Sequence, residues 1–130
     1  MKRTSLYKGK ITNAEVELKP WGWEKVWAHA DNYVGKILHI NSGHRLSLQY
    51  HEVKDETIHV LSGVLLLYVN ESQIEHTLSA GMSMRIHPRT IHRFEAPANG
   101  EPVVLLEAST PELDDVIRLE DDYNRVDAAK

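Results

Sequence analysis

The chain has 130 residues, of which 42% are hydrophobic, and this predicts one folded domain with a core of its own. Its formal net charge of −4 and the lack of a long basic stretch argue against nucleic acid as a partner. Cysteine is absent, which excludes disulfides and thiolate metal sites. The longest apolar run, residues 64–69, is too short to cross a bilayer, and the basic N-terminus lacks the apolar stretch of a signal peptide. We therefore expect a cytoplasmic protein without a membrane partner.

The first 18 residues are mixed and polar, and we expect them to form an N-terminal arm. The ordered part is predicted to open at residues 19–23, where Pro20 favours an extended chain and Gly22 permits a bend. Trp21, Trp23 and Trp27 follow closely on one another. We expect them to close one end of the core, and the alternative is that one of them lines a ligand pocket.

Short segments of β type make up the rest of the barrel region, residues 19–110. They are separated by turn signals such as Ser62-Gly63 and Pro97-Ala98-Asn99-Gly100, and no amphipathic helix of ten residues is evident. The segments are residues 34–40, 45–51, 57–61, 64–69, 73–78, 82–86, 92–96 and 103–108. Their regular spacing predicts an all-β sandwich or barrel. The acidic tail, residues 111–130, is expected to pack on the barrel as an edge strand or a short helix.

Four side chains are candidates for a metal site. Gln49 and His51 are two residues apart, so a strand would place both on one face. Glu56 follows after room for a bend, and His92 lies further along the chain. A set of oxygen and nitrogen donors without thiolate suits Zn²⁺, Mn²⁺, Fe²⁺, Co²⁺ or Ni²⁺. By contrast, His59 is out of phase with Glu56 and should point outward.

The spacing around these ligands resembles the two sequence motifs of the cupin family. The first motif reads Gly, five residues, His-x-His, three or four residues, Glu, six residues, Gly. The chain matches it with Gly43, Gln49, His51, Glu56 and Gly63, and differs only in having Gln49 at the first His position. The resemblance implies a single-domain cupin, which is a jelly-roll barrel or double-stranded β-helix.

The second cupin motif reads Gly, five residues, Pro-x-Gly, two residues, His. Here the same spacing joins Gly81 to His92, but His87 and Arg89 replace the Pro and the Gly. The departure affects the turn before the ligand more than the ligand itself.

A narrower resemblance is to the cupin-type phosphomannose isomerases, in particular the isomerase domain of bifunctional mannose-1-phosphate guanylyltransferases. The shared segments are Pro20-Trp21-Gly22, residues 43–51, residues 90–93 and residues 116–123. This resemblance implies a zinc-dependent isomerase that interconverts an aldose and a ketose, as sugars or sugar phosphates, through a cis-enediol. The broader cupin resemblance implies a homodimer, because cupins commonly pair through their sheets.

Candidate residues for that reaction lie beside the motifs. Lys36 is expected to be the base and Glu107 its polar support, while Arg45 and Arg93 are expected to bind the substrate, with Arg85 and Arg89 as further phosphate clamps. Residues 52–55 depart from the isomerases, so the substrate can differ. The alternatives are a non-catalytic metal- and sugar-binding cupin, or another metal-dependent cupin enzyme such as an oxygenase. The direction of Lys36, Arg45 and Glu107 discriminates between these functions, because the isomerase interpretation weakens sharply if they point out of the barrel.

Overall fold

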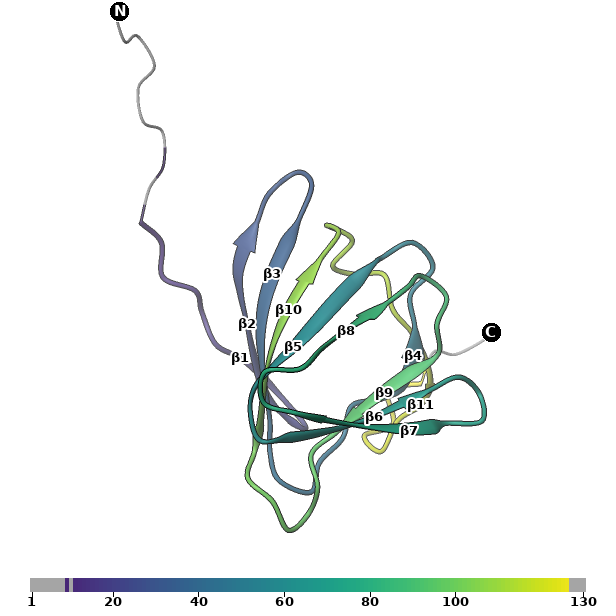
Figure 1. The fold of residues 1–130 in the computed structure, drawn as a ribbon. Coiled ribbons are helices and arrows are strands. Elements are labelled where there is room, and N and C mark those ends of the chain that lie inside the picture. The colour runs from purple at the N-terminus through teal and green to yellow at the C-terminus, as the bar shows by residue number, and fades with distance from the viewer. Residues whose placement is uncertain (1–8, 10, 127–130) are drawn as a thin grey trace, which may run out of the picture.

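A computed structural model describes residues 9 and 11–126, and Figure 1 shows their fold. This part of the chain forms eleven strands in two antiparallel sheets and contains no helix. It therefore holds no helix that could span a membrane. The prediction of an all-β, single-domain fold is confirmed.

The first sheet has six strands. Their order across the sheet is β1 (Glu17–Lys19), β2 (Gly22–His29), β3 (Val34–Ile40), β10 (Val103–Ser109), β5 (Glu56–Ser62) and β8 (Ser83–Ile86). Strand β10 lies between β3 and β5, which come much earlier in the chain. The middle of the sheet is therefore formed by pairing between segments that are far apart in the sequence.

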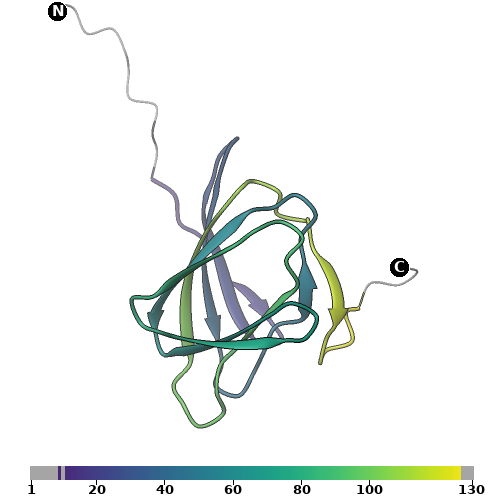
Figure 2. The same ribbon diagram turned by 45° about the vertical axis from the view of Figure 1, so that its right-hand side comes forward.

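The second sheet has five strands and faces the first. Their order is β11 (Ile117–Glu120), β4 (Leu48–Tyr50), β9 (His92–Glu95), β6 (Val64–Val69) and β7 (Ile74–Ser79). The acidic tail supplies β11, which pairs with β4 at the edge of this sheet, as Figure 2 shows in yellow. The tail thus forms the edge strand that was one of its two expected forms.

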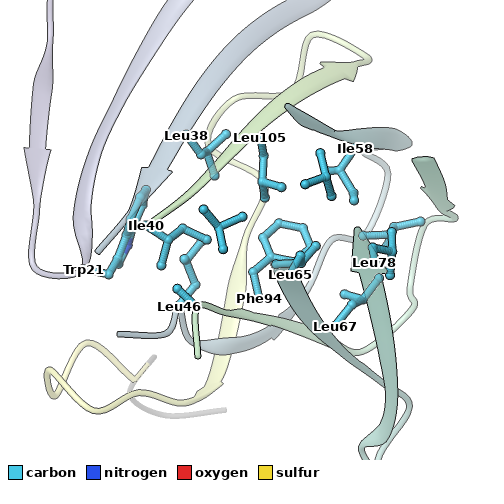
Figure 3. Close-up of a cluster of buried hydrophobic side chains, with 14 of the residues drawn as sticks. Trp21, Leu38, Ile40, Leu46, Ile58, Leu65, Leu67, Leu78, Phe94 and Leu105 are labelled. Carbon is cyan, nitrogen blue, oxygen red and sulfur yellow. The ribbon is translucent and has the colours of Figure 1, made fainter. Parts of the chain in front are cut away.

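The hydrophobic core fills the space between the sheets. Ile58 and Val60 of the first sheet and Leu65 and Leu67 of the second are inaccessible to solvent, and their side chains meet those of Phe94 and its neighbours (Figure 3). Each of these strands alternates buried and exposed positions, the pattern of a sheet with one face on a core.

The interior is apolar at one end and polar at the other. Along β3 the inward residues run from Lys36 to Leu38, and along β5 they run from Glu56 to Ile58. Because the pairing places Glu107 of β10 opposite both Lys36 and Ile58, the polar ends of the three strands lie together. The register of the sheet therefore gathers the charged side chains in one place.

Several predictions about local structure differ from what is observed. The strand expected over residues 45–51 is reduced to β4, with one isolated bridge from Arg45 to Glu95 before it. Trp21 is buried in the core, but Trp27 is 54% exposed, so the tryptophans do not act together as a plug. Of the expected N-terminal arm, residues 1–8 and 10 lie outside the described residues, as do residues 127–130 of the tail.

The glycine that ends the first motif is required by its turn. Gly63 has a φ of +80°, and a Cβ at this position would lie 2.5 Å from the carbonyl oxygen of Pro102. A side chain here would be strained by its backbone conformation and by this contact. The Ser62-Gly63 turn between β5 and β6 therefore depends on glycine.

Candidate metal centre and cavity

Three of the predicted ligands converge at the polar end of the interior. His51 directly follows β4, Glu56 begins β5 and His92 begins β9, and all three side chains are buried. One donor atom from each lies within 4.8 Å of the other two. This group can hold a metal ion.

The hydrogen bonds of the two histidines orient their free nitrogens toward this point. Nδ1–H of His51 donates to the carbonyl oxygen of Asp115, and Nδ1–H of His92 donates to that of Thr90 at 2.8 Å. Each ring therefore keeps a lone pair on Nε2, as metal-ligating histidines do. Among the described residues, neither Nε2 atom nor Oε2 of Glu56 has a well-aligned hydrogen-bond partner, although Oε2 of Glu56 lies 3.0 Å from Nε2 of His51 and 3.2 Å from Nζ of Lys54. Buried polar atoms without partners are costly, and a cation would satisfy all three, so the residues present fit a divalent metal.

The ionisation of the ligands also suits a metal. Burial works to raise the pKa of Glu56, but its contact with His51 and the charge of Lys54 outweigh burial and lower the pKa to about 2. Burial lowers the pKa of His92 below its usual value. At neutral pH the site therefore presents a carboxylate and a neutral imidazole, the forms that bind metals.

Gln49 lies next to the convergent group. It is the cross-strand neighbour of His92, and it lines a cavity that opens beside His51 and Glu56. Its Oε1 accepts a hydrogen bond from the Ser47 hydroxyl at 2.8 Å. Its side chain is therefore held beside the three ligands, and its role as a fourth ligand stays a prediction.

The altered second motif still forms its turn. Arg89 stands where the motif has Gly, and it adopts the left-handed backbone conformation that Gly would supply, with a φ of +66°. Its N–H donates to the carbonyl oxygen of His51 at 2.6 Å. This bond ties the turn to one ligand and holds His92, three residues later, near it.

A cavity of about 420 Å³ opens beside these ligands and is lined by residues of both sheets. Lys36 and Glu107, the two predicted catalytic residues, both line it. Nζ of Lys36 lies 3.1 Å from a carboxylate oxygen of Glu24, which also lines the cavity. Two of the three side chains whose inward direction favours an isomerase therefore face the cavity.

Lys54 is the main site residue that the sequence did not reveal. Its side chain is 6% exposed, and its Nζ lies 3.2 Å from Glu56 and 2.9 Å from Glu107. Lys54 lies in the loop between β4 and β5, directly after a bend at residues 52–53, so strand alternation gave no signal for the direction of this side chain. The only hint was its place among residues 52–55, where the chain departs from the isomerases.

The Lys54–Glu107 pair combines two buried groups of opposite charge. Burial works to lower the pKa of Lys54, but the carboxylates of Glu56 and Glu107 together raise it. Burial, reinforced by the charge of Glu56, raises the pKa of Glu107 despite the two lysines near it. The cavity therefore holds a charged ammonium group beside a carboxyl group that binds protons more readily than usual.

The expected substrate-binding role of Arg45 and Arg93 does not fit their positions. Arg45 donates two hydrogen bonds to Asp122, at 2.8 and 2.9 Å. Arg93 is 2% exposed, and it donates to the carbonyl oxygens of Leu46 and Glu120. Neither lines the cavity.

Strand alternation explains this correction. Arg93 lies between His92 and Phe94, which point inward, so its own side chain reaches the other face of the sheet, where the tail lies. The further candidates, Arg85 and Arg89, also stay outside the cavity, and Arg85 pairs with Asp55. Arg45 and Arg93 instead attach the tail to the second sheet.

The segment before β11 holds the loop between β4 and β5 in place. The carboxylate of Asp115 accepts hydrogen bonds from the backbone N–H groups of residues 52, 53 and 54, at 2.9, 2.7 and 2.8 Å. Leu113 and Val116 of the same segment line the cavity. This segment therefore orients His51 and Lys54 and forms part of the cavity wall.

Comparison with known proteins identifies the family. Residues 36–109, more than half of the chain, match the family model described as Cupin domain. The chain belongs to the cupin family. His59, which points away from the interior of this cupin and contacts Ser83, is confirmed as an outward residue.

One curated relative of this cupin is the mannose-1-phosphate guanylyltransferase RfbM of Salmonella typhimurium. The two are 31% identical over 105 residues, which cover 78% of this chain and 21% of RfbM. The chain thus spans about a fifth of the length of that relative.

Solved structures with the same fold come from proteins of different kinds. The capsular polysaccharide assembling protein CapF of Staphylococcus aureus matches with a TM-score of 0.73 and 16% identity, over 85% of this chain and 32% of CapF. The polyketide cyclase RemF of Streptomyces resistomycificus matches with a TM-score of 0.72 and 15% identity, over 88% of this chain and 86% of RemF. At such identities the likeness concerns the fold alone.

Proposed function

We propose that this cupin is a metal-dependent isomerase that interconverts an aldose and a ketose through a cis-enediol. The observation that carries the proposal is that the buried Lys54–Glu107 pair lines the same cavity as His51 and Glu56, two of the three residues that can hold a metal ion. Such a reaction needs a proton carrier close to a site that polarises the sugar oxygens. RfbM is named for a reaction of a mannose phosphate, which supports a sugar as the substrate class.

The metal would be held by His51, Glu56 and His92, with Gln49 as the fourth ligand. A bound divalent ion, for which we propose Zn²⁺, supplies electrostatic stabilisation of the oxygens at C1 and C2. The protein's part is to hold the sugar against these ligands and to move one proton.

Glu107 is the best placed group for the proton transfer. The pKa of Glu107 is raised toward neutral pH, and a general base whose pKa is close to the working pH can both take and return a proton. In the proposed reaction Glu107 removes the proton from C2 of the aldose and returns it to C1, and the proton of the C2 hydroxyl moves to O1. Lys54, 2.9 Å from Glu107, stabilises its ionised form. Lys36, the expected base, is engaged with Glu24 and is assigned to binding a hydroxyl group.

The two alternatives make different demands on the cavity. An oxygenase would favour an apolar interior, whereas this cavity is lined by paired charges such as Lys36–Glu24 and Lys54–Glu107. A non-catalytic sugar-binding cupin could use the same residues, so turnover has to decide between it and an isomerase.

We expect Zn²⁺-loaded protein in D₂O to interconvert an aldose and its ketose and to introduce deuterium, observed by NMR. Mannose with fructose and their 6-phosphates are the first pairs to try. Glu107→Gln should keep the metal and the bound sugar but lower kcat by about 100-fold or more, the usual contribution of general acid–base catalysis. If no aldose tested shows interconversion or exchange, while sugar binding persists, the non-catalytic cupin is the better description.

We also propose that the protein is a homodimer that pairs through its six-stranded sheet. Leu18 on β1, Trp27 on β2 and Leu61 on β5 are 82%, 54% and 47% exposed. A second copy would cover these exposed apolar side chains. Light scattering should give twice the chain mass at micromolar concentration, and Leu18→Lys with Trp27→Lys should give a monomer. A monomeric wild-type protein would contradict the proposal.

A further inference from the structure

A row of acidic and basic side chains leads from the metal-binding group to the rim of the cavity. The exposed fraction of the side chain rises along it, from 1% for Glu56 and 6% for Lys54 to 13% for Lys36, 23% for Lys19 and 64% for Glu17. All of these residues line the cavity. A sugar whose C1 and C2 lie at the metal-binding end would therefore extend its remaining carbons along this row.

Each lysine of the row is already paired with carboxylates. Lys54 lies between Glu56 and Glu107, and Nζ of Lys36 is 3.1 Å from Glu24. At the rim, Nζ of Lys19 is 3.5 Å from a carboxylate oxygen of Glu24 and 3.1 Å from one of Glu17.

The two arginines of the cavity wall, Arg118 and Arg125, are not free cations either. Arg125 is bound to Asp121 at 2.8 Å, and Arg118 is also engaged within the chain. Among the described residues, five acidic and five basic side chains line the cavity, so the wall carries no excess positive charge. The arginines expected to clamp a phosphate, Arg45 and Arg93, lie outside it.

A phosphate monoester and a free sugar make opposite demands on such a wall. The phosphate carries a charge of about −1.5 to −2 at pH 7 and offers strong acceptors, so it needs cations that are not already neutralised. Here it would have to displace Glu17 and Glu24 from Lys19 and would remain close to them. A hydroxyl group both donates and accepts, so it can bridge a carboxylate and a neighbouring ammonium without breaking their pairing.

Accordingly, we propose that the substrate of the isomerase proposed above is an unphosphorylated sugar, a neutral aldose or ketose. Its hydroxyl groups donate to Glu24 and Glu107 and accept from Lys36 and Lys54. Glu17 and Glu24, which occupy the rim around Lys19, are the residues that discriminate against a phosphate. The inference thus rests on the proposed function and makes the substrate class differ from that of the phosphomannose isomerases.

Calorimetry in phosphate-free buffer tests this proposal without depending on turnover. Zn²⁺-loaded protein is titrated with free aldoses, with their 6-phosphates and with inorganic phosphate. At least one free aldose should bind about 10-fold or more tightly than its phosphate, because like charges brought together cost at least that much. Glu17→Gln/Glu24→Gln should raise the affinity for the sugar phosphate about 10-fold or more. Glu17→Gln alone, at the more exposed position, should shift the preference in the same direction and does not depend on the buried Glu24.

The outcomes separate the two proposals. Tighter binding of a sugar phosphate than of its free sugar by the wild-type protein, or no binding of any free aldose, overturns the substrate class. Unchanged phosphate affinity in both variants also overturns it. If free aldoses bind in preference to their phosphates but are never isomerised, the substrate class stands and the isomerase function fails.

Discussion

Replacing His92 by alanine is expected to abolish tight Zn²⁺ binding. His92 supplies one of three buried donor atoms that lie within 4.8 Å of one another, and its Nδ1 bond to Thr90 orients the free nitrogen toward the other two. Even partners that only orient a ligand contribute about 10- to 100-fold to metal affinity, so loss of a ligand should exceed about 100-fold. Elemental analysis of purified protein and titration with Zn²⁺ against a competing chelator measure this.

The matched control for the metal site is His59→Ala. His59 also lies on a strand of the barrel, but it contacts Ser83 on the outer side of the sheet, so its loss should leave the metal content unchanged. Retention of one metal ion per chain in the His92→Ala variant would contradict the assignment. Gln49→Ala tests the fourth ligand in the same way.

Replacing Lys54 by methionine is expected to destabilise the metal-free protein strongly. Its ammonium group lies between two buried carboxylates, and its loss would leave Glu56 and Glu107 close together without a positive charge between them. Breaking a buried ion pair by removing one partner costs about 3–5 kcal/mol. Urea unfolding at pH 7 in the presence of EDTA, compared with the wild-type protein, gives this difference in the free energy of unfolding.

Two further variants show whether charge is the cause. Lys36→Met also removes an ammonium group that faces the cavity, but Glu24 keeps its contact with Lys19, so we expect a smaller loss of stability. Lys54→Met/Glu107→Gln removes one of the two carboxylates that are left without the ammonium group of Lys54, and it should recover part of the lost stability. A Lys54→Met variant that unfolds at the same urea concentration as the wild-type protein would show that the pair does not stabilise the fold.

The fold and the three residues that can hold a metal ion were readable from the sequence because they depend on local regularities. Short alternating segments separated by turn signals predicted the sheets, and the spacings from Gly43 to Gly63 and from Gly81 to His92 matched the cupin motifs. The substitution of Arg89 for Gly did not disturb the second motif, because Arg89 adopts the same backbone conformation. Alternation along β5 correctly placed His59 outside while Glu56 is inside.

The expectations that failed concern side chains whose direction is set by distant segments. Arg45 and Arg93 were expected in the cavity, but the tail, more than twenty residues beyond Arg93, pairs with them on the other face of the sheet. Lys54 was not singled out because it lies in the loop that contains the bend at residues 52–53, where side chains have no periodic direction. Asp115, which holds that bend through three backbone hydrogen bonds, is distant from it in the sequence.

The amino-acid sequence alone therefore determined the family, the jelly-roll architecture and three residues that can hold a metal ion. These follow from patterns within one or two neighbouring strands, where spacing decides which side chains share a face. Only the tertiary structure decided which charges enter the cavity and how they are paired, because the pairing of β10 with β3 and β5 brings Glu107 to Lys36 and Lys54. That pairing depends on contacts between distant segments, and it is what now favours an unphosphorylated sugar as the substrate.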